Sequence, residues 1–173
     1  MATNKYLNKI DALLHPTFKD KTKSLREEQA NMSLDISDRN VPYVMYSFDK
    51  IPTNLKSGIL QPYFRQNKAS ILSMCDYFIF CFENGKLYVL LVELKHGKDN
   101  VTKQLYAGRC FAKYIVDTLN RVEKINLTPH IRLISIRNKN ICKKGLQMKP
   151  VKYDKDNFCT FEGNSFQLLE FLK

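Results

Sequence analysis

The pattern of apolar positions is clearest over residues 75–95, where two strand-like segments flank Asn84-Gly85. The first segment reads CDYFIFCFE and the second KLYVLLVELK, and both are rich in aromatic and β-branched side chains. An Asn-Gly pair between such segments is the strongest short signal for a two-residue hairpin turn. Both faces of the segments are largely apolar, so we predict a hairpin that is buried on both sides.

Helical spacing of apolar residues and the positions of turn residues predict the other elements. Ser24 and Glu27 form a Ser-x-x-Glu capping box, which predicts that a helix begins at Ser24. The remaining predicted elements are a helix over residues 5–14, a strand over 43–48, a helix over about 100–122, a strand over 130–137, short strands within 150–161, and a final helix through Phe166, Leu169 and Leu172.

The order of these elements predicts the fold class. Strands that alternate with helices favour an α/β fold, in which a mixed central sheet is flanked by helices on both faces. At 173 residues the chain is long enough to bury one core and short for two domains. We therefore predict a single domain over residues 1–173.

Charge and cysteine content narrow the class of protein. Lys and Arg number 28 against 17 Asp and Glu, and the resulting charge of +11 favours a polyanionic partner. An acidic membrane surface would also attract this positive charge. However, no apolar run is long enough to span a bilayer, and we find no signal-peptide pattern at the start of the sequence. The five cysteines are scattered, with no pair at CxxC spacing, which argues against a disulfide framework or a zinc knuckle. This pattern predicts a reduced, cytoplasmic protein.

Candidate chemistry lies at the open end of the predicted hairpin. A two-residue turn places Asp76 opposite Glu93, with Cβ atoms about 4.5–5.5 Å apart, and strand alternation puts Lys95 on the same face. Two carboxylates in apolar surroundings repel each other and lose solvation, and a divalent cation would offset both effects. Hard oxygen ligands suit Mg²⁺ or Mn²⁺. The alternative remains open that one carboxylate simply forms an ion pair with Lys95.

Asp76, the Glu93-Leu94-Lys95 tripeptide and Gln104 together resemble the PD-(D/E)XK nuclease superfamily. Its characteristic arrangement is an Asp that opens one strand, Glu-x-Lys on the next strand, and often a polar residue on the following helix. The resemblance spans residues 75–115 and implies a restriction-endonuclease-like core. It implies that Asp76, Glu93 and the Leu94 carbonyl hold the metal, that Lys95 orients or activates the attacking water, and that Gln104 assists from the helix.

Many members of this superfamily also use a Glu from an early helix, for which Glu27 and Glu28 are the candidates. Glu27 already has a structural role as the N3 residue of the predicted capping box. Glu28 lies on the apolar face of the predicted helix with Leu25 and Met32, so Glu28 is preferred as an additional catalytic residue. A partly exposed charge at a helix start explains Glu28 equally well.

Basic residues near this centre are candidates for contacts with nucleic acid. Lys98 and Lys103 lie near the start of the helix predicted over about 100–122, where main-chain amides favour phosphate. Arg109 belongs to the same approach, although a solvated helix face explains it equally well. From residue 137 to residue 155 a basic stretch is predicted to contact nucleic acid. Its candidate residues are Lys143, Lys144 and Lys149.

These observations predict a Mg²⁺- or Mn²⁺-dependent phosphodiesterase that acts as an endonuclease, with DNA preferred to RNA. One alternative is a catalytically silent member of the same fold that binds nucleic acid within a larger complex. Another is a regulatory module whose basic surface meets an acidic partner. Cleavage of a duplex needs one centre for each strand, which favours a homodimer if duplex is the substrate.

Overall fold

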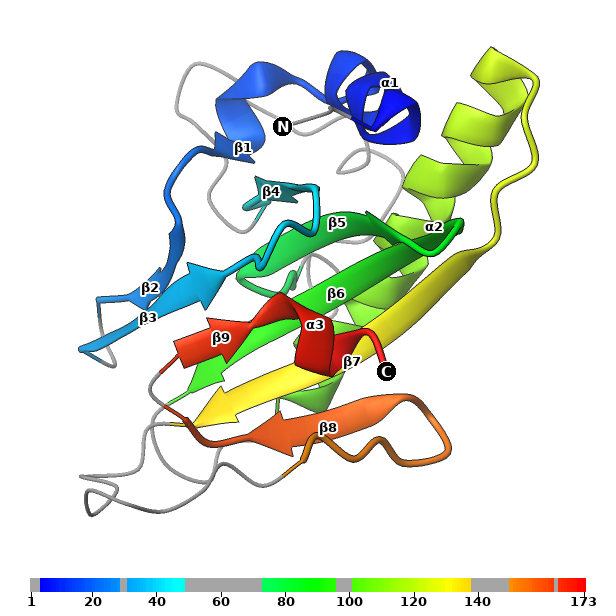
Figure 1. Cartoon of the computed structure of the whole chain (residues 1–173). Coiled ribbons are helices and arrows are strands. Elements are labelled where there is room, and N and C mark those ends of the chain that lie inside the picture. Colours follow the sequence, from blue (N-terminus) through cyan, green and yellow to red (C-terminus); the bar gives the residue numbers. More distant parts are fainter. Residues whose placement is uncertain (1–3, 29–30, 49–72, 96–100, 138–149, 164) are drawn as a thin grey trace.

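A mixed six-stranded sheet forms the centre of the molecule (Figure 1). The computed structural model describes residues 4–28, 31–48, 73–95, 101–137, 150–163 and 165–173. The strand order is β1-β4-β5-β6-β7-β8; β1, β4, β5 and β6 are antiparallel neighbours, and β7 and β8 continue the sheet in parallel with β6. The strands are β1 (Lys19–Asp20), β4 (Tyr43–Tyr46), β5 (Tyr77–Glu83), β6 (Lys86–Lys95), β7 (Pro129–Arg137) and β8 (Phe158–Phe161).

The β5–β6 hairpin has the register that the sequence predicts. Glu83 pairs with Lys86 across the two-residue turn. Asn84 and Gly85 have positive φ angles of 49° and 76°, as a type I′ turn requires at both central positions. The prediction of a hairpin buried on both sides is confirmed, because its two faces pack into two separate hydrophobic cores.

Helix α2 (Thr102–Glu123) connects β6 to the parallel strand β7 and lies against one face of the sheet (Figure 1). The predicted apolar side of this helix is buried, as expected from its spacing. Within the described ranges, no helix is long and apolar enough to cross a membrane. The predicted apolar positions are all buried, namely Val101, Leu105, Gly108, Ala112, Ile115 and Leu119, and Val116 is buried as well.

Different layers cover the two faces of the central sheet. Helix α1 (Lys5–Leu13) and α2 pack on one face, and the short turn η1 (Pro16–Phe18) leads from α1 into β1. A three-stranded sheet and one short helix pack on the other face, and the short helix lies in front of the central strands in Figure 1. The fold is therefore α/β, while the predicted layer of helices on this second face is not confirmed. The second layer consists of β2 (Ser24–Glu27), β3 (Met32–Ser37), β9 (Ser165–Gln167) and α3 (Leu168–Phe171).

The helix predicted to begin at Ser24 is wrong, because residues 24–27 form a strand antiparallel to β3. In β3, Met32 and Leu34 are buried and alternate with exposed neighbours, which is strand spacing. Ser24 Oγ accepts a hydrogen bond from Arg26 Nε over 2.9 Å and does not cap a helix. Pairing with β3 thus overrides the local capping signal.

The predicted final helix is right for Leu169 and wrong for Phe166. Phe166 lies in β9, where it pairs with Ile36 of β3 in parallel register. Helix α3 begins only at Leu168 and spans a single turn. A strand added to the small sheet was not visible in the local pattern, because its partner lies more than a hundred residues earlier in the chain.

Helix α2 approaches the sheet most closely at Gly108. A Cβ atom at this position would lie 2.7 Å from Cys75 Sγ and 3.3 Å from Phe78 Cζ. Glycine is therefore needed for the close contact of helix and sheet, next to the residue that precedes Asp76.

Candidate metal centre

The candidate centre lies where β6 and β7 end, at one edge of the central sheet (Figure 1). The two strands are parallel, so their carboxyl ends reach the same edge, a common place for ligands in α/β sheets. On the face covered by α2, Leu91 of β6 and Leu133 of β7 lie side by side in the core. Two residues further along β6 the side chain on this face is Glu93. The apolar core therefore ends at this point, and polar side chains follow it on the same face.

Asp76 and Glu93 meet at the open end of the hairpin. The β5–β6 ladder ends one position before them. The Asp76 N–H donates to Glu93 Oε2 over 3.2 Å, and the Leu94 N–H donates to Asp76 Oδ2 over 2.7 Å. Each carboxylate is therefore held by the main chain beside the other. The N–H and C=O of one strand residue point to the same side, so the Leu94 carbonyl is also directed toward Asp76.

Burial makes Glu93 the central group of this cluster. Its side chain is 1% exposed, and Lys95 Nζ lies 3.1 Å from Glu93 Oε1. Burial by itself lowers the pKa of Lys95, but the hydrogen bond and charge of Glu93, with the charges of Asp76 and Glu27, raise it above its usual value. Lys95 therefore carries a positive charge at neutral pH. The Glu93–Lys95 contact is the ion pair that the alternative interpretation predicts. The charges of both carboxylates, Asp76 and Glu93, act on the pKa of this lysine.

Strand β2 is fixed next to the centre by Tyr77. The Tyr77 hydroxyl donates to the Arg26 carbonyl over 2.9 Å and accepts from the Arg26 N–H over 2.8 Å. Tyr77 directly follows Asp76 in the chain, and Glu27 directly follows Arg26. The small sheet is thus tied to the segment that carries the first carboxylate.

The early acidic residue nearest the centre is Glu27. Burial lowers the pKa of Lys95, and the charge of Glu27 is among those that raise it. Glu28 is exposed and lies beyond the end of β2. The preference for Glu28 rested on a helical face, and this basis is wrong because the segment is a strand. The catalytic role of an early Glu stays a prediction.

Helix α2 carries the residues predicted to assist from the helix. Lys103 is exposed, Gln104 is half-buried, and the Arg109 guanidinium lies 4.5 Å from the centre of the Tyr106 ring. None of the hydrogen bonds among described residues joins Gln104 to the carboxylates or the lysine of the centre. The roles of these side chains stay predictions. The other predicted nucleic-acid contacts, Lys98, Lys143, Lys144 and Lys149, lie outside the described residues.

Strand β7 adds two polar residues that the sequence analysis did not assign to the centre. Ser135 lies beside Glu93, and Arg137 lies beside Lys95, in the parallel register of β6 and β7. Ser135 Oγ and Arg137 Nε are buried without a hydrogen-bond partner among the described residues. Their alternate spacing after an apolar run was a signal in the sequence. The sequence alone does not align β7 with β6, however, because the 22-residue helix α2 separates them.

The donor set fits a hard divalent cation. In the part of the chain that the structure describes, no three His, Cys, Asp or Glu side chains come together as a ligand group. Mg²⁺ commonly needs only one or two carboxylates, because water and substrate phosphate complete its shell. Asp76, Glu93 and the Leu94 carbonyl supply oxygen donors of this type.

Comparisons with known proteins add no family to this description. No protein-family model, no curated protein and no solved structure matches the chain. The interpretation of the centre therefore depends on its residues and their geometry.

Proposed function

We propose that this chain is a metal-dependent nuclease of the PD-(D/E)XK type, with its centre at Asp76, Glu93 and Lys95. One observation carries the proposal. Glu93, only 1% exposed, shares the open end of the hairpin with a second carboxylate and with Lys95. Two carboxylates set side by side repel each other, and burial adds to the cost of their charges. A divalent cation held by Asp76 and Glu93 would balance the pair.

The order of elements supports the same proposal. Asp76 directly precedes β5, Glu93 and Lys95 lie at the end of β6, and α2 follows in the chain. This order agrees with the arrangement that the sequence resemblance implies, an Asp opening one strand, Glu-x-Lys on the next and a helix after it. A restriction-endonuclease-like core is therefore part of the proposal.

The charge state of Lys95 defines its role in the reaction. When bound, the metal would lower the pKa of a water molecule and polarise the phosphate. Asp76, Glu93 and the Leu94 carbonyl would hold that ion. Burial lowers the pKa of Lys95, but the hydrogen bond and charge of Glu93 raise it above its usual value in the metal-free protein. Beside the metal, the Lys95 ammonium would orient the water and stabilise negative charge that develops on the phosphate.

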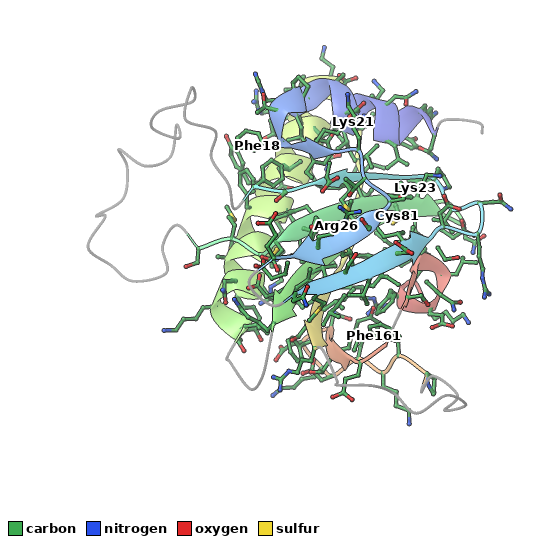
Figure 2. The ribbon with its side chains drawn as sticks, turned by 90° about the vertical axis from the view of Figure 1, so that its left-hand side faces the viewer. Phe18, Lys21, Lys23, Arg26, Cys81 and Phe161 are labelled. Atoms are coloured by element: carbon green, nitrogen blue, oxygen red, sulfur yellow. The ribbon has the colours of Figure 1, made fainter. Side chains whose placement is uncertain are left out.

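The basic surface supports a polyanionic substrate, with DNA preferred to RNA. The formal charge is +11, and phosphate neutralisation by such a surface drives association. Exposed Lys21 and Lys23 precede β2, and exposed Arg26 lies on it (Figure 2). The hydrogen bonds between Tyr77 and Arg26 fix this strand beside the segment that carries Asp76. These basic residues lie over the face of the central sheet opposite α2 and add to the positive surface of the molecule.

A second candidate is a catalytically silent protein that binds nucleic acid within a larger complex. The observation that favours it is the direct contact of Lys95 with Glu93, since a structural ion pair needs no metal. The two candidates differ in whether nucleic acid is hydrolysed.

Cleavage of labelled oligonucleotides tests the proposal. Single- and double-stranded DNA and RNA are incubated with the protein in Mg²⁺, in Mn²⁺ or with excess chelator. We expect metal-dependent cleavage that Asp76→Asn and Glu93→Gln abolish. Asp11→Asn is the matched control, because Asp11 also pairs with a lysine but lies on α1. This control should cleave at the wild-type rate.

Two outcomes would contradict the nuclease proposal. Cleavage that survives Glu93→Gln would place hydrolysis elsewhere or assign it to a contaminant. Binding of nucleic acid without cleavage in any metal would leave the silent binder.

A further inference from the structure

Strand β7 forms the second wall of the candidate centre. In the register of β6 and β7, Ser135 pairs with Glu93 and Arg137 with Lys95. Neighbouring strands lie about 4.8 Å apart, and paired residues present their side chains to the same face. Both β7 residues therefore lie on the α2 face of the sheet beside Glu93 and Lys95, and we call these four residues the polar row.

Two polar atoms of this wall have no hydrogen-bond partner in the described part of the chain. Ser135 is 0% exposed and its Oγ has no hydrogen-bond partner among the described residues, and Arg137 Nε is likewise buried without one. No ion pair between described residues includes Arg137. Buried donors without partners are rare in native proteins and call for a ligand or ordered water. Two of them lie next to the carboxylate pair, where a bound ligand would supply the missing partners.

The positive charges of Lys95 and Arg137 indicate that this ligand is an anion. Lys95 and Arg137 are lateral neighbours, and like charges set side by side on a sheet destabilise it. An anion between them would reverse this repulsion. A guanidinium has five donors and no acceptor, and its fork matches the oxygens of a phosphate.

Arg132, the other arginine of β7 with an unpartnered buried Nε, shows the contrast. It is five positions before Arg137, so it faces the opposite side of the sheet. Its guanidinium lies 4.4 Å from the centre of the Tyr153 ring and also bonds to Asn157. Packing on an aromatic ring therefore explains Arg132, and nothing comparable among the described residues explains Arg137.

We propose that Arg137 binds a backbone phosphate of the nucleic acid, next to the carboxylates and on the β7 side of Lys95. The inference rests on the proposed function, because it assumes that nucleic acid enters this centre. It adds a substrate-binding residue from a strand that carries none of the residues in the Asp/Glu-x-Lys pattern. Metal would be held on the Asp76 side of the row and phosphate on the Arg137 side.

Binding and cleavage measured in parallel test this inference. The variants are Arg137→Gln, which removes the charge, and Arg137→Lys, which keeps the charge and loses the fork. Arg132→Gln is the matched control from the opposite face. Affinity for fluorescently labelled DNA is measured with Ca²⁺ in place of Mn²⁺ over a range of salt concentrations. The increase in melting temperature on adding Mn²⁺ without DNA reports the metal side separately.

For Arg137→Gln we expect DNA affinity to fall about tenfold to a hundredfold, as for the loss of a charged hydrogen bond. The slope of log affinity against log salt should decrease by about one. Arg137→Lys should keep the slope and lose part of the affinity. The Mn²⁺-induced rise in melting temperature should be unchanged in both, and Arg132→Gln should bind DNA as the wild type does.

The outcomes separate this inference from the proposed function. Wild-type affinity and slope in Arg137→Gln, with cleavage intact, would overturn the inference and leave the nuclease proposal standing. Loss of affinity in Arg137→Gln without cleavage by any variant or the wild type would support the inference and overturn the nuclease proposal. A wild-type protein that binds no nucleic acid would overturn both. If Arg137→Gln fails to fold, Arg137→Lys decides by the same affinity measurement, since wild-type affinity there contradicts binding by the fork.

Discussion

Asp11 and Glu93 each contact a lysine, but their surroundings differ. Asp11, on α1, accepts a hydrogen bond from the Tyr46 hydroxyl over 2.6 Å and another from Lys19 Nζ over 2.5 Å. Burial by itself would raise the pKa of Asp11, but these two hydrogen bonds and the lysine charges lower it. Each carboxylate oxygen has its own donor. We call these three residues the closed cluster.

The cluster around Glu93 differs in what it borders. It holds two carboxylates with Lys95 in contact, and beside it lie Ser135 Oγ and Arg137 Nε, which have no partner among the described residues. Both clusters are built from the same kinds of side chain. An ion pair that is closed on itself is structural, whereas one that borders buried polar atoms without partners is a candidate site.

The largest expected difference between the clusters is in catalysis. Lys95→Met removes the ammonium and keeps an unbranched chain of similar reach, so the fold should survive. Loss of one preorganised charge that stabilises the transition state should lower the cleavage rate by about 10²–10³-fold. DNA affinity should remain near that of the wild type. Single-turnover kinetics and equilibrium binding measure the two quantities separately.

Lys19→Met is the control from the closed cluster and should cleave at the wild-type rate. Full activity in Lys95→Met would mean that Lys95 is a structural counter-ion and that both clusters are of one kind.

The next largest effect is stabilisation by metal. Mg²⁺ or Mn²⁺ should raise the melting temperature, because the ion binds the folded carboxylate pair and not the unfolded chain. At a concentration about 100 times its Kd, the gain in free energy of unfolding is about 2.7 kcal/mol. Glu93→Gln should abolish this rise and Asp11→Asn should keep it. Thermal unfolding with calorimetric titration checks the prediction, and absence of metal binding with and without DNA would leave only the non-catalytic interpretation.

The smallest effect concerns the closed cluster. Tyr46→Phe removes one hydrogen bond to Asp11 and should lower the free energy of unfolding by about 1 kcal/mol, with no change in cleavage. The folded-state pKa of Asp11 is lowered, so its contribution is present above the ordinary pKa and is lost as pH falls through the folded-state value. In Tyr46→Phe the folded-state pKa of Asp11 is less depressed, so this loss should be smaller and should be complete at a higher pH. Urea unfolding from neutral to acidic pH tests both parts, and an identical pH profile in the variant would argue against the hydrogen bond.

Local patterns were sufficient for the hairpin and for α2. The Asn84-Gly85 turn determines the register of β5 and β6, and this register brings Asp76 next to Glu93. Turn chemistry and strand alternation are local properties, and the sequence displays both.

Non-local pairing explains what the sequence did not reveal. Residues 24–27 pair with β3 and do not form the helix that the capping signal at Ser24 predicts. Phe166 belongs to a sheet whose other strands lie near the start of the chain. Ser135 and Arg137 reach the centre only because β7 aligns in parallel with β6 after α2. Such alignment depends on how the helix packs, which no short stretch of sequence specifies.

Gly108 makes the spacing of the carboxylates depend on the position of a helix. A methyl group there would meet Cys75 Sγ at 2.7 Å, and Cys75 is joined to Asp76 by one peptide bond. The position of α2 over the sheet therefore bears directly on the segment that carries Asp76. Metal coordination tolerates errors of only about 0.2 Å in ligand distance. Binding of a metal by Asp76 would thus require closer packing of α2 at Gly108 than the fold itself requires.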